Sequence, residues 1–439
     1  MKHICILILT CIEVVYGTNL FRKNEYKFTH WKHYSGISPY FESNQEQLNP
    51  QLDRTCQINK SIYLIRHGRI VVDDYDYFNV IRPFLKRLNQ LKQVEQLNKN
   101  SRLNLLLNWQ SPFANETVEQ MTQLGLIESY QFGIELSLKH KDFFLFNRTT
   151  KYRIWAAASQ RTKQTAEQIL RGLFHSTNVN ETELISISED KHRGTNSLTP
   201  TKTCHSFRPS DGSKQANTWL KFYSKSILKR LNSELKHFQL TNRDIFAMQQ
   251  ICAYEFNLKE FSSFCSLFTI EDTLAFEYYF DVKYHYEIGY GNRLTPYLAI
   301  HWLKSISNLF NQSKQNVYLT VVHREMLSIV LVTLGLFNQT NDFPLNEIDW
   351  HRPFRSSWFL SFLSRIEFQL FSCSNEKFIR ILSNNKVLPI PSCSQGIYFS
   401  CPFKLFLHYI DQRFQQYRHF NQICQLNSNE TFSRIDFYD

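Results

Sequence analysis

Arg66 and His67 form the first pair of residues in this sequence with clear chemical potential. They follow an apolar, β-branched run at 61–65, and Gly68 comes next. This pattern predicts a buried strand that delivers a guanidinium and an imidazole to the carboxyl edge of an α/β sheet, where such sheets bind ligands. Gly68 allows a sharp turn and a close approach to a ligand. An imidazole can attack phosphorus while a guanidinium holds the phosphoryl oxygens. Taken alone, the tripeptide also fits a strand-end ion pair with a surface histidine.

Two further strand ends offer matching groups. Residues 153–159 predict a second core strand, and Arg161 follows it at the start of a helix, whose N-terminus also favours an anion. Residues 316–322 predict a third strand, which runs into His323 and Glu325. Each residue has a plainer interpretation when considered singly. These are a surface arginine in a loop, a buried structural imidazole and a helix-capping carboxylate.

Together these side chains supply the parts needed to hydrolyse a phosphomonoester through a covalent intermediate. We expect His67 to be the nucleophile that forms a phosphohistidine. Arg66, Arg161 and His323 are expected to neutralise the charge on the transferring phosphoryl group. We expect Glu325 to protonate the leaving alcohol and then to take a proton from the attacking water. No cofactor or metal is expected, because this chemistry requires none and no residue cluster has metal-ligand spacing.

The composition narrows the class of partner. The chain has 439 residues and a formal net charge of +11, a balance that suits a small anionic substrate, although a generic solvated basic surface is the simpler interpretation. It has no basic block long enough for a nucleic-acid arm and no zinc-finger, RRM or KH signature, so nucleic acid is not expected as a partner. The oligomeric state cannot be inferred from the sequence.

The first 17 residues predict a secretory signal peptide. Lys2 and His3 precede an apolar run at 4–15, and Val15-Tyr16-Gly17 resembles a cleavage site. This run is too short to span a membrane, and no other segment reaches spanning length without charges. No hydrophobic C-terminal tail suggests a lipid anchor. We therefore expect a protein of the secretory pathway that is secreted or lumenal.

The cysteines agree with an oxidising compartment. Eight remain after the predicted signal, and their spacing favours disulfides over a metal site. Cys252 and Cys265 are the expected local pair, and the other pairings stay open. Glycosylation sequons, each a hypothesis, begin at Asn59, Asn115, Asn147, Asn180, Asn311, Asn338 and Asn429.

The motifs resemble those of the histidine phosphatase superfamily, in its acid-phosphatase and phytase branch. The likeness begins at Ile65-Arg66-His67-Gly68 and continues at Ala157-Ala158-Ser159-Gln160-Arg161-Thr162. Within that branch it is strongest to the multiple inositol polyphosphate phosphatases, which have His-Ala-Glu where this chain has His323-Arg324-Glu325 and other acid phosphatases have His-Asp. Further matching segments lie at 38–40, 250–256, 265–268, 289–291 and 385–389.

The resemblance implies a fold of class α/β. A three-layer α/β/α core with a mixed, mostly parallel sheet, as in phosphoglycerate mutases, would carry an inserted α-helical cap. One domain would cover residues 18–439. The long helical and aromatic segment at about 190–300 is the main candidate for the cap, and 72–110 is a second candidate segment. A further strand is expected at 358–363.

The resemblance also implies a phosphatase acting on inositol polyphosphates, including phytate, and on 2,3-bisphosphoglycerate. Two alternatives stay open: a weakened or inactive homologue that binds polyanions, and a histidine acid phosphatase of broad specificity.

Two departures from the family pattern bear on the site. The family has Arg-His-Gly-x-Arg-x-Pro, whereas here Arg69 stands one place early and the proline is missing. We expect Arg69 to bind the phosphate if the loop is one residue shorter. Arg324 replaces a small residue beside the acid, and as a neighbouring cation it should favour the ionised form of Glu325. Alternatively its side chain points away and binds a peripheral phosphate.

Overall fold

The computed structural model describes residues 28–42, 52–97, 100–144, 151–174, 182–209, 212–312, 315–339, 341–427, 432 and 434–439. The predicted signal peptide at 1–17 and the sequons at Asn147, Asn180 and Asn429 lie outside these residues. Residues 31–439 form one structural unit, which carries all the motifs described above.

The three predicted core strands are parallel neighbours in one sheet. β1 (Cys56–Arg66) pairs with β4 (Val317–Val322), which pairs with β2 (Tyr152–Ala157), and β3 (Thr182–Ile187) completes the parallel side. In β1, Ile62 and Leu64 face one hydrophobic cluster, while Tyr63 and Ile65 face another. Since both faces are buried, the strand is continuously apolar in sequence.

The sheet continues on the other side of β1 with antiparallel strands. β5 (Arg365–Cys373) pairs with β1, and β6 (Glu376–Ser383) follows it. The strand expected at 358–363 is wrong. A 3₁₀ turn at Ser356–Trp358 leads into a buried apolar loop, and the next strand begins only at Arg365. The complete order is β3-β2-β4-β1-β5-β6-β7, with β7 at Lys386–Leu388 and β8 (Cys401–Pro402) paired to β6.

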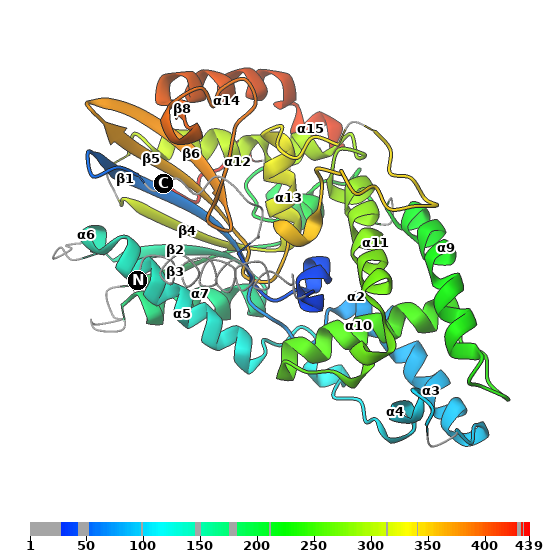
Figure 1. The fold of residues 1–439 in the computed structure, drawn as a ribbon. Helices are drawn as coiled ribbons and strands as arrows, with labels where there is room; N and C mark the ends of the chain where they lie inside the picture. The colour runs from blue at the N-terminus through cyan, green and yellow to red at the C-terminus, as the bar shows by residue number, and fades with distance from the viewer. Residues whose placement is uncertain are drawn as a thin grey trace, which may run out of the picture. The chain divides into compact units, whose positions relative to one another are not determined.

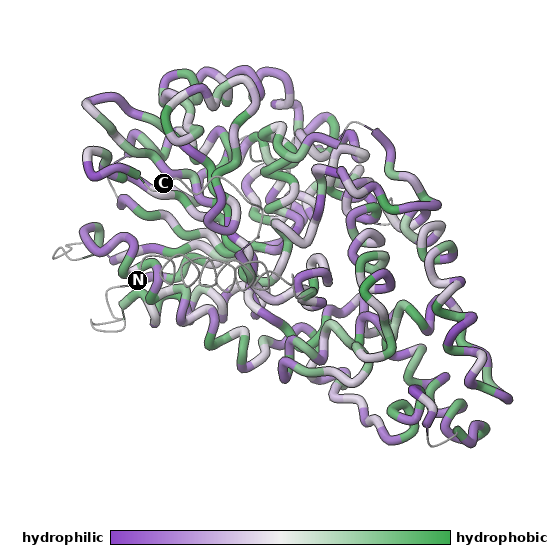
Figure 2. Tube along the Cα trace, viewed as in Figure 1, coloured by the Kyte–Doolittle hydropathy of each residue, from purple (hydrophilic) through white to green (hydrophobic). Residues whose placement is uncertain are grey.

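Helices cover both faces of this mixed sheet, as predicted. α5 (Gln123–Lys139) and α7 (Gln160–Leu173) lie on one face, and α12 (Thr295–Leu309) and α14 (Phe403–Tyr417) lie on the other (Figure 1). α5 and α7 approach so closely at Gly133 that an added Cβ there would lie 2.2 Å from a backbone oxygen of α7. Hydrophilic residues are prominent along α14 in Figure 2, since it buries only Phe406 and Ile410.

A second group of helices occupies the predicted cap segment. α9 (Ser213–Asn232), α10 (Asn242–Lys259) and α11 (Ile270–Ile288) gather beside α3 (Arg82–Val94) and away from most of the sheet (Figure 1). The Thr269 side chain caps α11 by accepting a hydrogen bond from the Asp272 backbone N–H. The assignment of these helices as a cap, and the domain limits, stay predictions. The short helices α2 (Asp74–Asp76), α4 (Asn104–Asn108), α6 (Lys141–Phe144), α8 (Pro200–Thr203), α13 (Arg324–Thr333) and α15 (Phe420–Ile423) complete the helical elements named in Figure 1 or used below.

The eight cysteines expected in the mature protein form four disulfides. The predicted bridge between Cys252 and Cys265 is confirmed. The others join Cys56 to Cys373, Cys204 to Cys424 and Cys393 to Cys401. Within the described ranges, no helix combines the length and apolar character needed to cross a membrane.

Candidate active site

The ends of β1 and β4 bring two histidines together. Arg66 pairs in register with Val322, so His67 and His323 follow adjacent strand ends. Their ring centroids lie 5.6 Å apart. Arg161, in the first turn of α7, donates from Nε to His67 Nε2 across 3.3 Å. The fold therefore gathers side chains from three segments that are far apart in the sequence.

The His67 imidazole has one tautomer that suits its surroundings. Its Nδ1 lies 2.9 Å from the Gly68 carbonyl oxygen, and a carbonyl can only accept, so the proton belongs on Nδ1. Nε2 then carries the lone pair. Burial lowers the pKa of His67 well below its ordinary value, and Arg66, Arg161 and His323 act in the same direction. The ring is therefore held in its neutral, nucleophilic form.

Gly68 is required by close packing. A Cβ there would lie 2.9 Å from both the Gly125 carbonyl oxygen and the Ser129 hydroxyl of α5. The Gly68 N–H donates to Thr165 Oγ1 of α7 across 3.0 Å. The turn after β1 is thus clamped between two helices, which fixes the backbone that carries His67.

Arg66 is a buried cation with spare donor capacity. Its Nη1 donates to the carbonyls of Gly36 and Leu360, and its guanidinium carbon lies 4.2 Å from the centre of the Phe362 ring. Nε has no hydrogen-bond partner among the described residues. Burial, followed by the neighbouring Arg324, lowers the pKa of Arg66 to about 9, so it stays charged at acid pH. A buried, unpartnered donor of this kind favours an anionic ligand.

His323 is held by a carboxylate that sequence reasoning missed. Its Nε2 lies 2.9 Å from Glu189, which also accepts from the Ser159 N–H and from Lys202. Nε2 must donate to the carboxylate, which leaves Nδ1 without a partner in the described part of the chain. Burial lowers the pKa of His323, while Glu189 opposes that shift. The only signal for Glu189 was its place two residues beyond β3.

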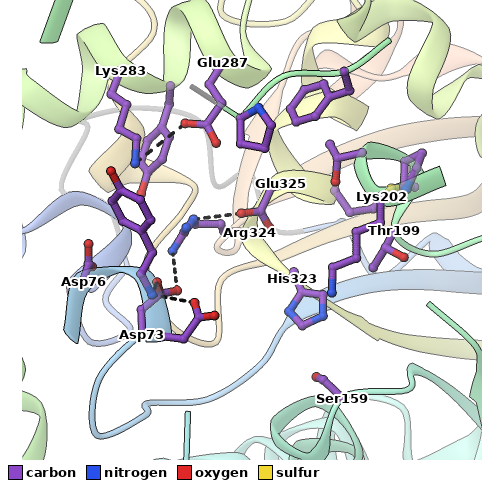
Figure 3. A pocket seen from close by; sticks show the side chains of 18 of the residues that line it. Asp73, Asp76, Ser159, Thr199, Lys202, Lys283, Glu287, His323, Arg324 and Glu325 are labelled. Carbon is purple, nitrogen blue, oxygen red and sulfur yellow. Dashed lines mark hydrogen bonds and ion pairs between the residues drawn. The ribbon is translucent and has the colours of Figure 1, made fainter. Parts of the chain in front are cut away.

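Glu325 and Arg324 lie side by side in the first turn of α13 (Figure 3). Arg324 Nε lies 3.1 Å from Glu325 Oε1, and its Nη1 lies 3.5 Å from Asp73 Oδ2. Burial acts to raise the pKa of Glu325, but Arg324, then His323 and Arg66, outweigh it and lower the pKa. The predicted effect of Arg324 on the acid is therefore confirmed, and its side chain lines the cavity instead of pointing away.

Arg69 is paired with a carboxylate of α5, where a contact with the phosphate was expected. Its Nε donates to Glu128 of α5 across 2.8 Å, and its Nη2 donates to the second carboxylate oxygen. The next residue, Ile70, forms a short antiparallel bridge with Met121, two residues before α5. Arg69 is not among the residues that line the cavity.

A cavity of about 650 Å³ opens in front of these groups. Arg66 and His67 are buried and are not among its lining residues, whereas Arg161 and His323, which neighbour His67, do line it. The described lining carries six carboxylates against four Lys and Arg side chains, so the net positive charge of the chain is not concentrated there. The carboxylates are Asp73, Asp74, Asp76, Glu119, Glu287 and Glu325, and the cations are Arg161, Lys202, Lys283 and Arg324.

Glu119 is a second residue that the sequence did not indicate. Its carboxylate pairs with Arg161 Nη1, on the edge of the guanidinium that an anion would use. Glu119 also has carboxylate oxygens within 4.8 Å of those of Asp73 and Asp74, a grouping that could attract a cation. Arg161 and Arg324 already pair with two of the three, so the cluster fits a site balanced by guanidinium groups better than a metal site.

Comparison with known proteins gives one consistent family. Residues 57–384 match the histidine phosphatase superfamily (branch 2). A constitutive acid phosphatase of Saccharomyces cerevisiae is 24% identical over 416 residues, covering 92% of this chain and 88% of the relative. A phytase of Candida albicans is 27% identical over 414 residues, with the same coverage of the two chains.

Solved structures show the same fold. The phytase from D. castellii has a TM-score of 0.86 at 21% identity, over 94% of this chain and 90% of that one. The multiple inositol polyphosphate phosphatase of Bifidobacterium longum, in complex with inositol hexasulfate, has a TM-score of 0.63 at 11% identity, over 85% and 96%. The predicted superfamily and branch are confirmed.

Arg69 generates a prediction about stability. Arg69→Ala should lower the free energy of unfolding by about 1–3 kcal/mol, because it leaves the half-buried Glu128 carboxylate without its forked partner. The Michaelis constant for a phosphomonoester should not change. Urea unfolding and steady-state kinetics on the same preparation measure both. A tenfold rise in the Michaelis constant with unchanged stability would contradict the structural role.

Glu119 generates a prediction about pH. Burial raises the pKa of Glu119, Arg161 opposes this, and Asp73 and Asp74 add to it, for a net rise. As the pH falls, Glu119 takes up a proton and releases Arg161, so anions should bind more tightly. Glu119→Gln should therefore strengthen sulfate inhibition at pH 7 several-fold and leave it unchanged at pH 4. Sulfate is the probe because it stays a dianion across this range.

The exposed Glu116→Gln, in the same turn, is the matched control for Glu119→Gln. Its pH profile of sulfate inhibition should follow that of the wild type. Parallel profiles for Glu119→Gln and the wild type would show that the ion pair does not control access to Arg161.

Proposed function

This chain belongs to branch 2 of the histidine phosphatase superfamily and is a phosphatase, and we propose that it works through a phosphohistidine at His67. The observation that carries the proposal is the unprotonated Nε2 of His67, whose lone pair accepts only a 3.3 Å hydrogen bond from Arg161 Nε among the described residues. It faces Arg161 and lies among buried groups whose donors lack partners in the described chain, Arg66 Nε above all. This arrangement suits a tetrahedral dianion held directly in front of a neutral imidazole.

In the first step, the Nε2 lone pair attacks phosphorus and the bond to the leaving oxygen breaks. Arg66, Arg161 and His323, which takes up a proton on Nδ1 when the dianion binds, hold the phosphoryl oxygens as charge is redistributed. Protonated Glu325 gives its proton to the departing oxygen, so the leaving group is released as an alcohol. The enzyme then carries phosphohistidine and an ionised carboxylate.

In the second step, a water molecule attacks the phosphohistidine. Glu325 takes a proton from this water, the P–N bond breaks, and inorganic phosphate leaves. Because Glu325 must start protonated and the neighbouring cations outweigh burial and lower its pKa, turnover should be favoured by acid pH. Acid phosphatases among the relatives agree with this expectation.

We further propose inositol polyphosphates as substrates. Lys202 and Lys283 add cations to the cavity beyond those assigned to one phosphoryl group, and the cavity volume suits a substituted ring. Burial raises the pKa values of Asp76 and Glu287, with like charges adding to both, so these carboxyls become neutral first as the pH falls. The cavity should therefore accept a polyanion best under acid conditions.

A broad-specificity acid phosphatase is the second candidate. The excess of carboxylates over cations in the described lining favours it, since a polyanion would meet repulsion at neutral pH. Both candidates hydrolyse a phosphomonoester by the same two steps. They differ in the leaving alcohol that the cavity accepts.

We also propose that the protein passes through the secretory pathway. The predicted signal peptide and the four disulfides support this, because structural disulfides form and persist in oxidising compartments.

The nucleophile prediction is tested by trapping. His67→Ala should lose turnover by about a thousandfold or more. A labelled phosphomonoester, quenched in alkaline detergent, should leave an acid-labile phosphoprotein in the wild type and none in His67→Ala. Equal turnover by both proteins would overturn the mechanism. Sulfate binding by a wild type that lacks both turnover and label would identify the inactive polyanion-binding homologue.

The role of Glu325 is tested with two leaving groups. Glu325→Gln should slow release of an alkyl alcohol far more than release of 4-nitrophenolate, which needs no proton. Labelled phosphoprotein should accumulate, because the attacking water has lost its base. Equal slowing of both substrates would contradict the acid role.

The substrate proposal is tested by competition between substrate classes. Phytate should be hydrolysed with a kcat/KM above that of 4-nitrophenyl phosphate at pH 4–5, and this preference should shrink toward pH 7. A strong preference for 4-nitrophenyl phosphate at every pH would support the broad-specificity candidate.

A further inference from the structure

Arg324 departs from the family pattern, and the two-step mechanism above assigns it no role. Arg69 is committed to Glu128, so the loop after β1 contributes only Arg66 and His67 to the described cluster. Arg324, directly after His323, instead puts a guanidinium into the cavity (Figure 3). We propose that Arg324 binds the substrate's transferring phosphoryl group, and that this same movement releases Glu325 to act as the acid. This inference rests on the proposed phosphohistidine mechanism.

The backbone around Gly36 brings Arg324 close to Arg66. A Cβ on Gly36 would lie 3.6 Å from Arg324 Cδ, and the Gly36 carbonyl accepts a hydrogen bond from Arg66 Nη1. Both arginines thus contact one glycine from different strand ends. The neighbouring Arg324 also contributes to the lowered pKa of Arg66, after burial. A phosphoryl dianion that reached both guanidinium groups would accept charge-assisted hydrogen bonds from each.

The partners of Arg324 are side chains on the cavity wall, and their contacts with its guanidinium are long or poorly aligned. Its Nη1 lies 3.5 Å from Asp73, at the limit of a hydrogen bond. Its Nε lies 3.1 Å from Glu325, yet it lacks a hydrogen-bond partner of good geometry in the described chain. The guanidinium carbon lies 5.6 Å from the centre of the Tyr284 ring, which can support the side chain while its charged end moves.

Movement of Arg324 would change the proton affinity of Glu325. With Arg324 beside it, the carboxylate is stabilised in its ionised form. A bound phosphoryl dianion draws the guanidinium away and adds negative charge, and both effects favour protonation. Glu325 would then take one proton from solvent on substrate binding and pass it to the leaving oxygen. Substrate binding thereby couples protonation of Glu325 to the presence of a phosphoryl group.

Anion binding to the whole enzyme tests this inference. Sulfate inhibition constants should weaken by about tenfold or more in Arg324→Ala, because a charge-assisted contact is lost. Arg324→Lys should recover part of the affinity, since it keeps the charge but not the fork. Arg69→Ala is the matched control and should bind sulfate like the wild type. Unchanged sulfate affinity in Arg324→Ala would overturn the proposal.

Proton uptake on sulfate binding would not change in Arg324→Ala if Arg324 had only a structural role. Sulfate binding at pH 5–6, measured calorimetrically in buffers of different ionisation enthalpy, should be accompanied by proton uptake in the wild type. The uptake should fall in Arg324→Ala and in Glu325→Gln. Equal uptake by the wild type and Arg324→Ala would overturn the coupling to Glu325.

Failure of this inference can be told from failure of the proposed function. A wild type without turnover and without labelled phosphoprotein would contradict the phosphohistidine mechanism, whatever Arg324 does. A wild type with both, together with an Arg324→Ala variant of unchanged sulfate affinity, would contradict only the assignment of Arg324.

Discussion

The parallel register between β1 and β4 is the constraint on which the site depends. Arg66 stands opposite Val322, so the two residues that follow, His67 and His323, leave adjacent strands at the same level. A slip of one residue would move one imidazole by about 3.3 Å and turn it to the other face of the sheet. Burial on both faces prevents such a slip, because it would place apolar side chains out of register with the helices above and below. The two imidazoles are thus positioned by the core of the sheet.

The same burial creates an electrostatic problem that the site resolves with carboxylates. Several cations lie close together at low exposure, and each has an anionic or carbonyl partner in the empty protein. His323 has Glu189, Arg161 has Glu119, and Arg66 has two backbone carbonyls. A substrate therefore exchanges one set of anionic contacts for another. Carboxylates that must yield to a phosphate do so most readily when protonated, which links the architecture to acid conditions without any separate pH sensor.

The sequence predicted the residues at the strand ends, but it did not predict the residues that loops carry into the site. The three strand ends were predictable because buried parallel strands are continuous apolar runs, and each run ends abruptly on a polar motif. Glu119 and Glu189 were not predictable, since they reach the site from connections whose paths depend on tertiary packing. The expectation for Arg69 differs from the structure for a related reason. The position of Arg69 in the motif suggested the phosphate, but its guanidinium pairs with Glu128 of α5. The prediction of a strand at 358–363 was wrong because an apolar run indicates burial, and burial alone does not distinguish a strand from a packed loop.

A phosphoryl site specifies where positive charge must lie in space and leaves open which segment supplies it. The turn after β1 is clamped by Gly68 between α5 and α7, which leaves Arg69 little freedom to reach the cavity. The first turn of α13 has no such clamp, because its neighbours across the cavity are side chains such as Asp73 and Tyr284. A guanidinium placed there can move, whereas one placed at position 69 cannot. Movement of the Arg324 guanidinium would change the proton affinity of Glu325, which a fixed cation would not do. A fixed guanidinium would favour the ionised form of Glu325 throughout the cycle, whereas one that leaves on substrate binding helps this carboxyl to serve first as acid and then as base.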